Sequence, residues 1–208
     1  MRAMRNMCAR LTQLLICLGV AVPLLVGTAH AALDPAVGQI TSLDNALLES
    51  MKAGATLTVT ERYRRLAPVI ELTFDLPTMT AFAVGSAWAK FSADQQQATI
   101  AAFTRLTIAS YAHNFAGFDG QRFEINSDVV VRGVDKIVRT RLTSPHSASV
   151  DLMYRMRESS GSWKIIDVYY GAISQLTTRR ADFAASITSG GASSLVAHLN
   201  SLSDDLLR

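Results

Sequence analysis

The chain has 208 residues, of which 49% are hydrophobic and 18% are charged. This balance excludes a disordered or collagen-like chain, and the length is sufficient for one domain with a buried core. The formal net charge of +3 suggests a basic protein, but it depends on the first 31 residues.

Residues 1–31 have the pattern of a secretory signal peptide. Arg2, Arg5 and Arg10 precede an apolar run from Leu11 to Val26. The sequence Ala-His-Ala at positions 29–31 then provides small residues at the two positions that determine cleavage. An uncleaved membrane anchor is the alternative, but the run is shorter than the roughly 20 residues that span a bilayer. We expect cleavage after position 31, export to the periplasm, and a single mature domain of residues 32–208.

Cleavage would change the charge and the cysteine content. The 20 basic residues less the three arginines leave 17, against 17 acidic residues. A nucleic-acid partner requires a basic surface, so none is expected. Cys8 and Cys17 would also be lost, and the histidines lack metal-ligand spacing, so we expect no disulfide, metal or cofactor.

The segment from Asp34 to Gly54 predicts an amphipathic helix, with Pro35 in its first turn. Its apolar residues recur every three or four positions: Val37, Ile40, Leu43, Leu47, Leu48 and Met51. The charged segment from Thr58 to Arg65 is interpreted as a solvent-exposed face. Pro68 opens a second apolar piece that ends at Leu76-Pro77, and Asp75 and Thr78 are both suitable helix N-caps.

Residues 77–116 remain helical in pattern, with a break near Gly85. Ser92 with Gln95 forms a capping box, the usual start of a helix. One face of that helix mixes apolar residues with hydroxyls: Ile100, Phe103, Leu106, Thr107, Ser110 and Tyr111. Two interpretations are equally supported, a helix packed on a sheet or a helix lining an incompletely filled cavity.

After Asn114 the hydrophobic period changes to two, which predicts four antiparallel strands joined by short turns. They cover residues 122–133, 136–144, 147–158 and 162–171. The third alternates apolar with charged side chains, and we expect Arg155 and Arg157 to pair across the sheet with opposite charges. The last segment is helical again on both sides of Gly190-Gly191. The layout is therefore α+β, with an N-terminal helical part, a curved four-stranded sheet wrapped over helices, and C-terminal helices.

The fourth strand is apolar on both faces, which places it deep in the sheet and requires a partner for Asp167. Lys164, Arg179 and Arg180 are its candidates in the sequence. No nucleophile, phosphate-loop or zinc motif occurs. A general base at Asp75 or Asp167 is conceivable, although salt bridging is the simpler role for both carboxylates.

Several ordered pieces of the sequence resemble the periplasmic lipid-binding proteins of the Mla (maintenance of lipid asymmetry) pathway, also called the toluene-tolerance auxiliary family. The matching residues are Phe74-Asp75, Gly85 to Trp88, Gln95-Gln96, Phe103, Tyr111-Ala112, Val150, Tyr154-Arg155, Trp163 to Ile165, Asp167-Val168, Ser174, Arg180, Asp182-Phe183, Gly191 and Leu195 to Leu199. The run GAISQLTTRRADFA resembles the branch associated with hopanoid biosynthesis, and there Gly171-Ala172 replaces the Glu-Gly usual in the family.

This resemblance implies a cone-shaped sheet related to nuclear transport factor 2, with lipid held between sheet and helices. It implies a carrier, not an enzyme, that shuttles a hopanoid or a phospholipid between inner- and/or outer-membrane lipid transport complexes such as ABC transporters. The expected lipid-binding residues are those that a sheet over helices would turn inward: Phe82, Trp88, Phe103, Tyr111, Leu152, Tyr154, Met156 and Ile165. Arg179 and Arg180 are expected to contact lipid headgroups or a partner, or to pair with Asp167 or Asp182.

Two other function classes share this layout, because a fold does not determine a function. A pocket enzyme of the ketosteroid-isomerase type would require a carboxylate with a strongly raised pKa that points into the cavity. An interaction module that carries nothing would have no cavity, or one filled by side chains.

Overall fold

Helices precede and follow one sheet along the chain in the computed structural model, which describes residues 33–208. The expected signal peptide lies outside the described residues. The helices before the sheet are α1 (Pro35–Ala53), the short 3-10 helix η1 (Gly54–Thr56), α2 (Val59–Thr73), α3 (Leu76–Val84), the 3-10 helix η2 (Gly85–Lys90) and α4 (Ala93–Asn114). The strands are β1 (Arg122–Arg132), β2 (Asp135–Thr143), β3 (Val150–Ser159), β4 (Ser162–Tyr170) and β5 (Ile173–Ser174), and α5 (Gln175–Leu206) follows.

Local capping signals define the helix starts. The Asp34 carboxylate accepts a hydrogen bond from the Ala36 amide at 2.9 Å, which starts α1 where the sequence predicts. Ser92 and Gln95 form the predicted capping box at the start of α4. Asp75 caps α3 through the amide of Thr78, so this carboxylate has a structural role. α2 continues through Pro68 without ending there.

The sheet is antiparallel, with the strands in chain order from β1 to β5. The four predicted strands are confirmed to within a few residues, but the prediction of four strands misses a fifth. β5 is only two residues long, and Ile173 pairs with Tyr170 after a turn at Gly171, whose φ is 57°. A strand this short has no readable hydrophobic period, so the sequence pattern could not show it.

An irregular register between β3 and β4 changes which residues face the helices. Tyr154 pairs with Val168 and Met156 pairs with Ile165, so a β-bulge separates the two pairs. Ile165 and Val168 consequently lie on the same, core-facing side, although strict alternation would place them on opposite sides. β1 also has an irregular register between Asn126 and Val130, where the strand bends.

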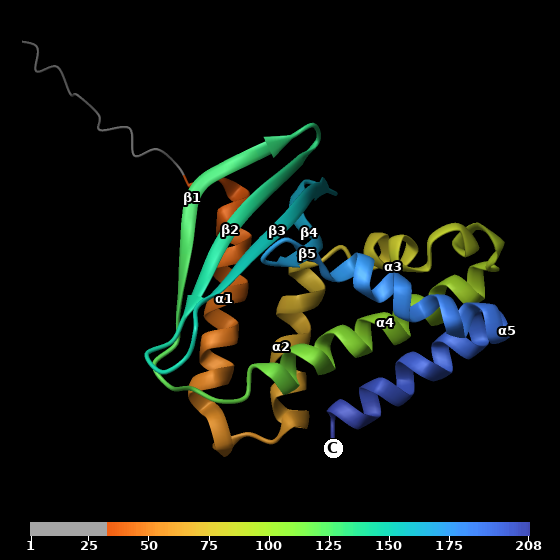
Figure 1. The fold of residues 1–208 in the computed structure, drawn as a ribbon, viewed down its shortest axis with the longest axis horizontal. Coiled ribbons are helices and arrows are strands. Elements are labelled where there is room, and N and C mark those ends of the chain that lie inside the picture. The colour runs from red at the N-terminus through yellow and green to blue at the C-terminus, as the bar shows by residue number, and fades with distance from the viewer. Residues whose placement is uncertain (1–32) are drawn as a thin grey trace, which may run out of the picture. The chain divides into compact units, whose positions relative to one another are not determined.

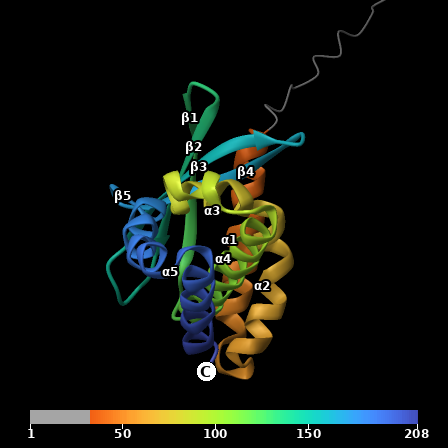
Figure 2. The same ribbon diagram turned by 90° about the vertical axis from the view of Figure 1, so that its right-hand side faces the viewer.

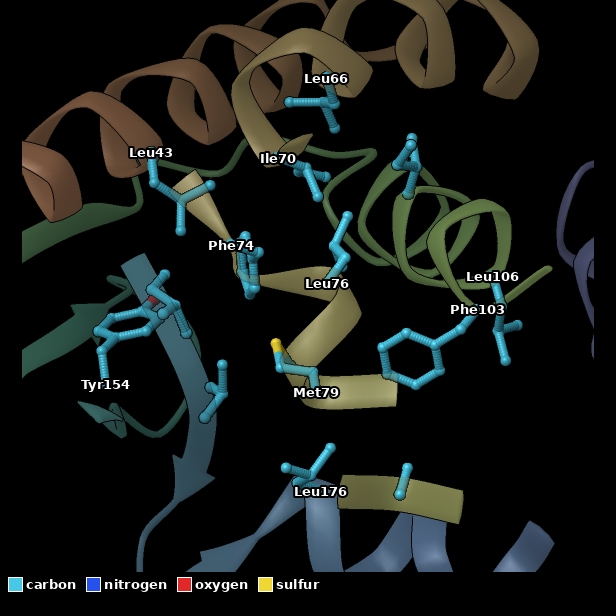
Figure 3. Close-up of a cluster of buried hydrophobic side chains, with 14 of the residues drawn as sticks. Leu43, Leu66, Ile70, Phe74, Leu76, Met79, Phe103, Leu106, Tyr154 and Leu176 are labelled. Carbon is cyan, nitrogen blue, oxygen red and sulfur yellow. The ribbon is translucent and has the colours of Figure 1, made fainter. Parts of the chain in front are cut away.

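The sheet and the helices enclose one apolar core. α1 runs along the sheet, and α3, α4 and α5 gather beside β4 and β5 (Figures 1 and 2). α5 bends sharply at Gly190 and Gly191, so its two arms form a V (Figure 1). Figure 3 shows Phe74 between the side chains of α1 and β3 and those of α4. Within residues 33–208, no helix has the length and apolarity needed to cross a membrane.

One expectation about charged residues requires correction, and another is confirmed. Arg62 lies in the segment interpreted as a solvent-exposed face, but it is buried and donates hydrogen bonds to the carbonyls of Ala112 (2.8 Å) and Leu57 (2.6 Å). The prediction that Arg155 and Arg157 of β3 pair across the sheet with an opposite charge is confirmed, because both pair with Asp135 of β2, whose side chain is almost fully buried. A further cross-strand pair joins Arg141 of β2 to Asp151 of β3, at 2.6 Å.

Candidate functional site

A cavity of about 130 Å³ lies where α3, α4 and the first arm of α5 meet β4. Its walls are mostly apolar and its polar residues come from α4 and from the start of α5. The lining residues are Phe74, Met79, Phe103, Leu106, Thr107, Ser110, Tyr111, Asn114, Phe115, Val168, Tyr170, Gln175, Leu176 and Arg179.

α4 supplies the longest wall of the cavity, and this supports the cavity interpretation of its hydroxyl-bearing face. Thr107 and Ser110 turn their hydroxyls back to their own helix, where they donate to the carbonyls of Phe103 (2.9 Å) and Leu106 (2.8 Å). Because both hydroxyls are satisfied within the helix, they require no polar partner from a ligand. The wall that faces the cavity is therefore effectively apolar.

Aromatic rings that pack on one another form the inner side of the cavity. The rings of Phe74 and Tyr111 meet edge to face with centroids 5.6 Å apart, and Tyr111 stacks on Phe115 at 5.6 Å. Burial, reinforced by Tyr170 and by Asp44, raises the pKa of Tyr111, so its phenol stays neutral. The inner wall is thus aromatic and uncharged.

The entrance to the cavity is polar and carries a positive charge. Asn114, Gln175 and Arg179 are the lining residues with amide or guanidinium groups. Arg179 is partly buried, and its guanidinium is the charged group of the lining. An apolar interior with one arginine at its edge suits a ligand with a hydrocarbon part and an anionic or polar head.

A buried hydrogen-bond network fixes the start of α5 against the sheet. The Ser174 hydroxyl donates to Asp167 Oδ2 at 2.7 Å, and the Leu176 amide donates to Asp167 Oδ1 at 3.2 Å. The expectation that Lys164, Arg179 or Arg180 pairs with Asp167 is therefore wrong. A carboxylate at a helix N-terminus is stabilised by the free amides and by the helix dipole, so it requires no basic side chain.

The structure distributes the expected lipid-binding residues over three environments. Phe103 and Tyr111 line the cavity, as does Arg179. Tyr154, Met156 and Ile165 are fully buried in the adjoining core, and Leu152 is buried and lines a second depression over β1 to β3. Trp88 packs on Phe91 at the edge of the core, and the Phe82 side chain is 59% exposed.

Arg180 lies next to Arg179 in the sequence but serves another contact. Its guanidinium approaches Gly85, where an added Cβ would come within 3.0 Å of it. Gly85 ends α3 with a φ of 68°. Arg180 is therefore in contact with the junction of α3 and η2, and it is not among the cavity residues.

Sequence reasoning missed more than half of the cavity lining. Leu106 is on the same predicted face of α4 as Phe103, so helical periodicity alone identifies it. Others come from separate segments that converge only in the folded chain: Phe74, Met79, Asn114, Phe115, Val168, Tyr170, Gln175 and Leu176. No local signal places these residues together.

Comparison with known proteins agrees with this geometry. A family model described as "MlaC protein" matches residues 41–201. One similar solved structure is that of the phospholipid-binding protein from Ralstonia solanacearum in complex with a phospholipid, with a TM-score of 0.73. The two sequences are 23% identical, and the match covers 84% of this chain and 100% of that one. At this identity the likeness shows a shared fold.

Proposed function

The chain belongs to the MlaC protein family, and from this membership and from its cavity we propose that it is a carrier for a membrane lipid. The hydrocarbon part of the lipid occupies the cavity between α4, α5 and β4, and its head lies near Arg179. The lipid is a phospholipid or a hopanoid. The carrier works in the periplasm after removal of residues 1–31, and it exchanges its cargo with lipid transport complexes of the inner and/or outer membrane.

The observation that carries this proposal is the cavity itself, apolar inside and with its charge at the entrance. A neighbour with the same fold is described as binding a phospholipid, which supports a lipid of that class as the cargo. The signal-peptide pattern of residues 1–31 supports the periplasmic location.

The energetics of a lipid in water explain why a carrier is needed. Each methylene buried away from water contributes about 0.8 kcal/mol, so a chain of ~15 methylenes loses on the order of 10 kcal/mol when it leaves a bilayer unprotected. A protein cavity that offers comparable apolar surroundings removes most of this barrier. The cavity must not bind far more tightly than the bilayer, because release at the acceptor would then be slow.

The described cavity is smaller than the space a whole lipid requires. Small-molecule sites usually measure about 300–1,000 Å³, against about 130 Å³ here. Loading therefore requires the walls to separate. The walls formed by α3, α4 and α5 meet through side chains, so they can separate without breaking the hydrogen bonds of the sheet.

The two other function classes account less well for this site. Within the described residues, the cavity lining contains no aspartate or glutamate, and the buried Asp44 is not among the lining residues, so the closed cavity offers no carboxylate general base. An interaction module that carries nothing would have a filled interior, whereas this interior has a cavity. Binding without chemistry is the simplest function for these residues.

Lipid extraction with a cavity-filling variant tests the proposal. Protein purified without detergent from its native host should release a lipid on organic extraction, identified by mass spectrometry. Thr107→Phe fills the cavity from the α4 wall and should reduce the lipid recovered per mole at least fivefold. Thr104→Phe is the matched control, because Thr104 is on the same helix, also partly buried, and outside the lining. Absence of lipid from the wild-type protein, or equal recovery from both variants, would contradict the proposal.

A further inference from the structure

Two buried polar side chains near the cavity have no hydrogen-bond partner. Asp44 of α1 is 2% exposed and neither of its carboxyl oxygens is hydrogen-bonded. The Thr140 hydroxyl of β2 lies beside the Tyr154 phenol and at the second depression over β1 to β3, and it is also buried without a hydrogen bond of good geometry. An unsatisfied buried polar group costs about 1–3 kcal/mol, so folded proteins rarely retain two without a reason.

The sheet register relates Thr140 to the cavity. Thr140 pairs with Leu152, which pairs with Tyr170, so the three residues form one row across β2, β3 and β4. Tyr170 lines the cavity. Because neighbouring strands are about 4.8 Å apart, Thr140 lies roughly 10 Å from Tyr170 along this row.

The position of Asp44 follows from its tyrosine neighbours. Burial is the largest cause of the raised pKa of Tyr111 and Tyr154, and the negative charge of Asp44 raises the pKa of both phenols further. Asp44 is therefore near both tyrosines. Tyr111 lines the cavity, and Tyr154 is beside Thr140 on the core face of the sheet. Figure 3 shows Tyr154 opposite Leu43, the residue that precedes Asp44 in α1. Asp44 on α1 and Thr140 on the sheet therefore share Tyr154 as a neighbour, and Asp44 is also near Tyr111 of the cavity wall.

We propose that Asp44 and Thr140 form a polar inner end of the lipid site, which binds a hydroxyl group on the buried part of the lipid. This inference rests on the proposed carrier function and narrows its cargo to lipids that carry an alcohol away from the head. When the cavity expands to admit a lipid, displacement of Tyr111 and Leu152 opens it toward this pair.

The chemistry of the pair suits an alcohol. A carboxylic acid can donate its proton to the alcohol oxygen, while the alcohol proton is donated to the Thr140 oxygen or to the second Asp44 oxygen. Burial raises the pKa of Asp44 to about 8, so the carboxyl group remains largely protonated at neutral pH and can act as this donor. An unsubstituted hydrocarbon end would leave both groups unsatisfied.

Paired fatty-acid probes test the inner end directly. The delipidated protein is titrated with stearic acid, with 12-hydroxystearic acid and with its 9- and 16-hydroxy isomers, and each Kd is divided by that of stearic acid. For at least one isomer, this Kd ratio should be about tenfold lower in the wild-type protein than in Asp44→Leu or Thr140→Val. Asp44→Asn should retain most of this preference, because an amide still donates and accepts hydrogen bonds.

The controls separate this inference from the carrier function. Thr99→Val removes a buried hydroxyl that is already bonded to the Gln95 carbonyl, so it should leave all the ratios unchanged. If stearic acid binds but no ratio differs between the wild-type protein and the Asp44 and Thr140 variants, the polar inner end is wrong and the carrier function stands. The same holds if Thr99→Val changes the ratios as much as Thr140→Val. If no fatty acid binds, the carrier proposal fails as well. Circular dichroism confirms that each variant is folded.

Discussion

The Ser174 hydroxyl donates a 2.7 Å hydrogen bond to the Asp167 carboxylate, and this contact joins β4 to the first turn of α5. Ser174 also accepts from the Thr177 amide, so one hydroxyl serves the sheet and the helix together. Leu176 and Arg179, both residues of the cavity lining, follow within two turns of helix. The geometry of the cavity entrance therefore depends on this network.

Removal of the Asp167 carboxylate should destabilise the protein and disturb the cavity. Asp167→Ala leaves the Ser174 hydroxyl and the Leu176 amide without their acceptor, so we expect a loss of about 2–3 kcal/mol in the free energy of unfolding. Chemical denaturation measures the loss. Asp182→Ala, an exposed carboxylate on the same helix, should change the free energy of unfolding by less than about 0.5 kcal/mol. Equal effects of the two substitutions would show that the network contributes no particular stability.

Two glycines should respond oppositely to the same substitution. Gly85→Ala places a Cβ within 3.0 Å of the Arg180 guanidinium, in a backbone with φ of 68° that alanine rarely adopts. We expect a loss of about 1–2 kcal/mol in unfolding free energy. Gly38 is inside α1 with open space around it, so Gly38→Ala should increase stability by about 0.5–1 kcal/mol. Thermal unfolding of both variants checks the signs, and a stabilising Gly85→Ala would contradict the close packing of Arg180 on Gly85.

Helix ends and strand positions were predictable because their signals are local. The carboxylate of Asp34 and the Ser92 capping box determine where α1 and α4 begin, and short-range alternation identifies four strands. The bulge that turns Ile165 and Val168 to the same face depends on the pairing of β3 with β4, which no local pattern contains. The strand was therefore predictable and its faces were not.

From the sequence, a cavity beside α4 was one of two equally supported interpretations, and its full set of lining residues was not predictable. The hydroxyl-bearing face of that helix fits either a packed helix or a cavity wall, and the structure favours the wall, with Phe103 and Tyr111 in the lining. The opposite walls depend on where α5 begins beside the sheet. Its start is held by the hydrogen bond from the Leu176 amide to Asp167, and not by an ion pair between Asp167 and a basic residue. Long-range geometry of this kind leaves no periodic signal.

Charge reversal at Arg179 should weaken the binding of lipids with anionic heads. We expect Arg179→Glu to raise the Kd for a vesicle-derived anionic phospholipid about 3- to 10-fold and to reduce its salt dependence, because the group at the entrance becomes repulsive. Arg65→Glu makes the same net change on an exposed part of α2 and should leave the Kd within about twofold. Arg180→Glu should act on stability instead, through the contact with Gly85. Unchanged binding by Arg179→Glu would remove the headgroup role.

The stability of the protein should depend on pH through Asp44. Burial raises the pKa of Asp44 from its ordinary value of 3.8 to about 8, so between these values the folded state holds a proton that the unfolded state has lost. The free energy of unfolding should therefore be highest near pH 4, fall as the pH rises, and level off above about 8, with a contribution from this group on the order of 4 kcal/mol by pH 7. Asp44→Asn cannot ionise and should flatten this slope, so that the variant gains stability relative to the wild-type protein as the pH increases. Urea unfolding of both proteins at a series of pH values measures the difference. Parallel curves would show that Asp44 is ionised, or hydrated, in the folded protein.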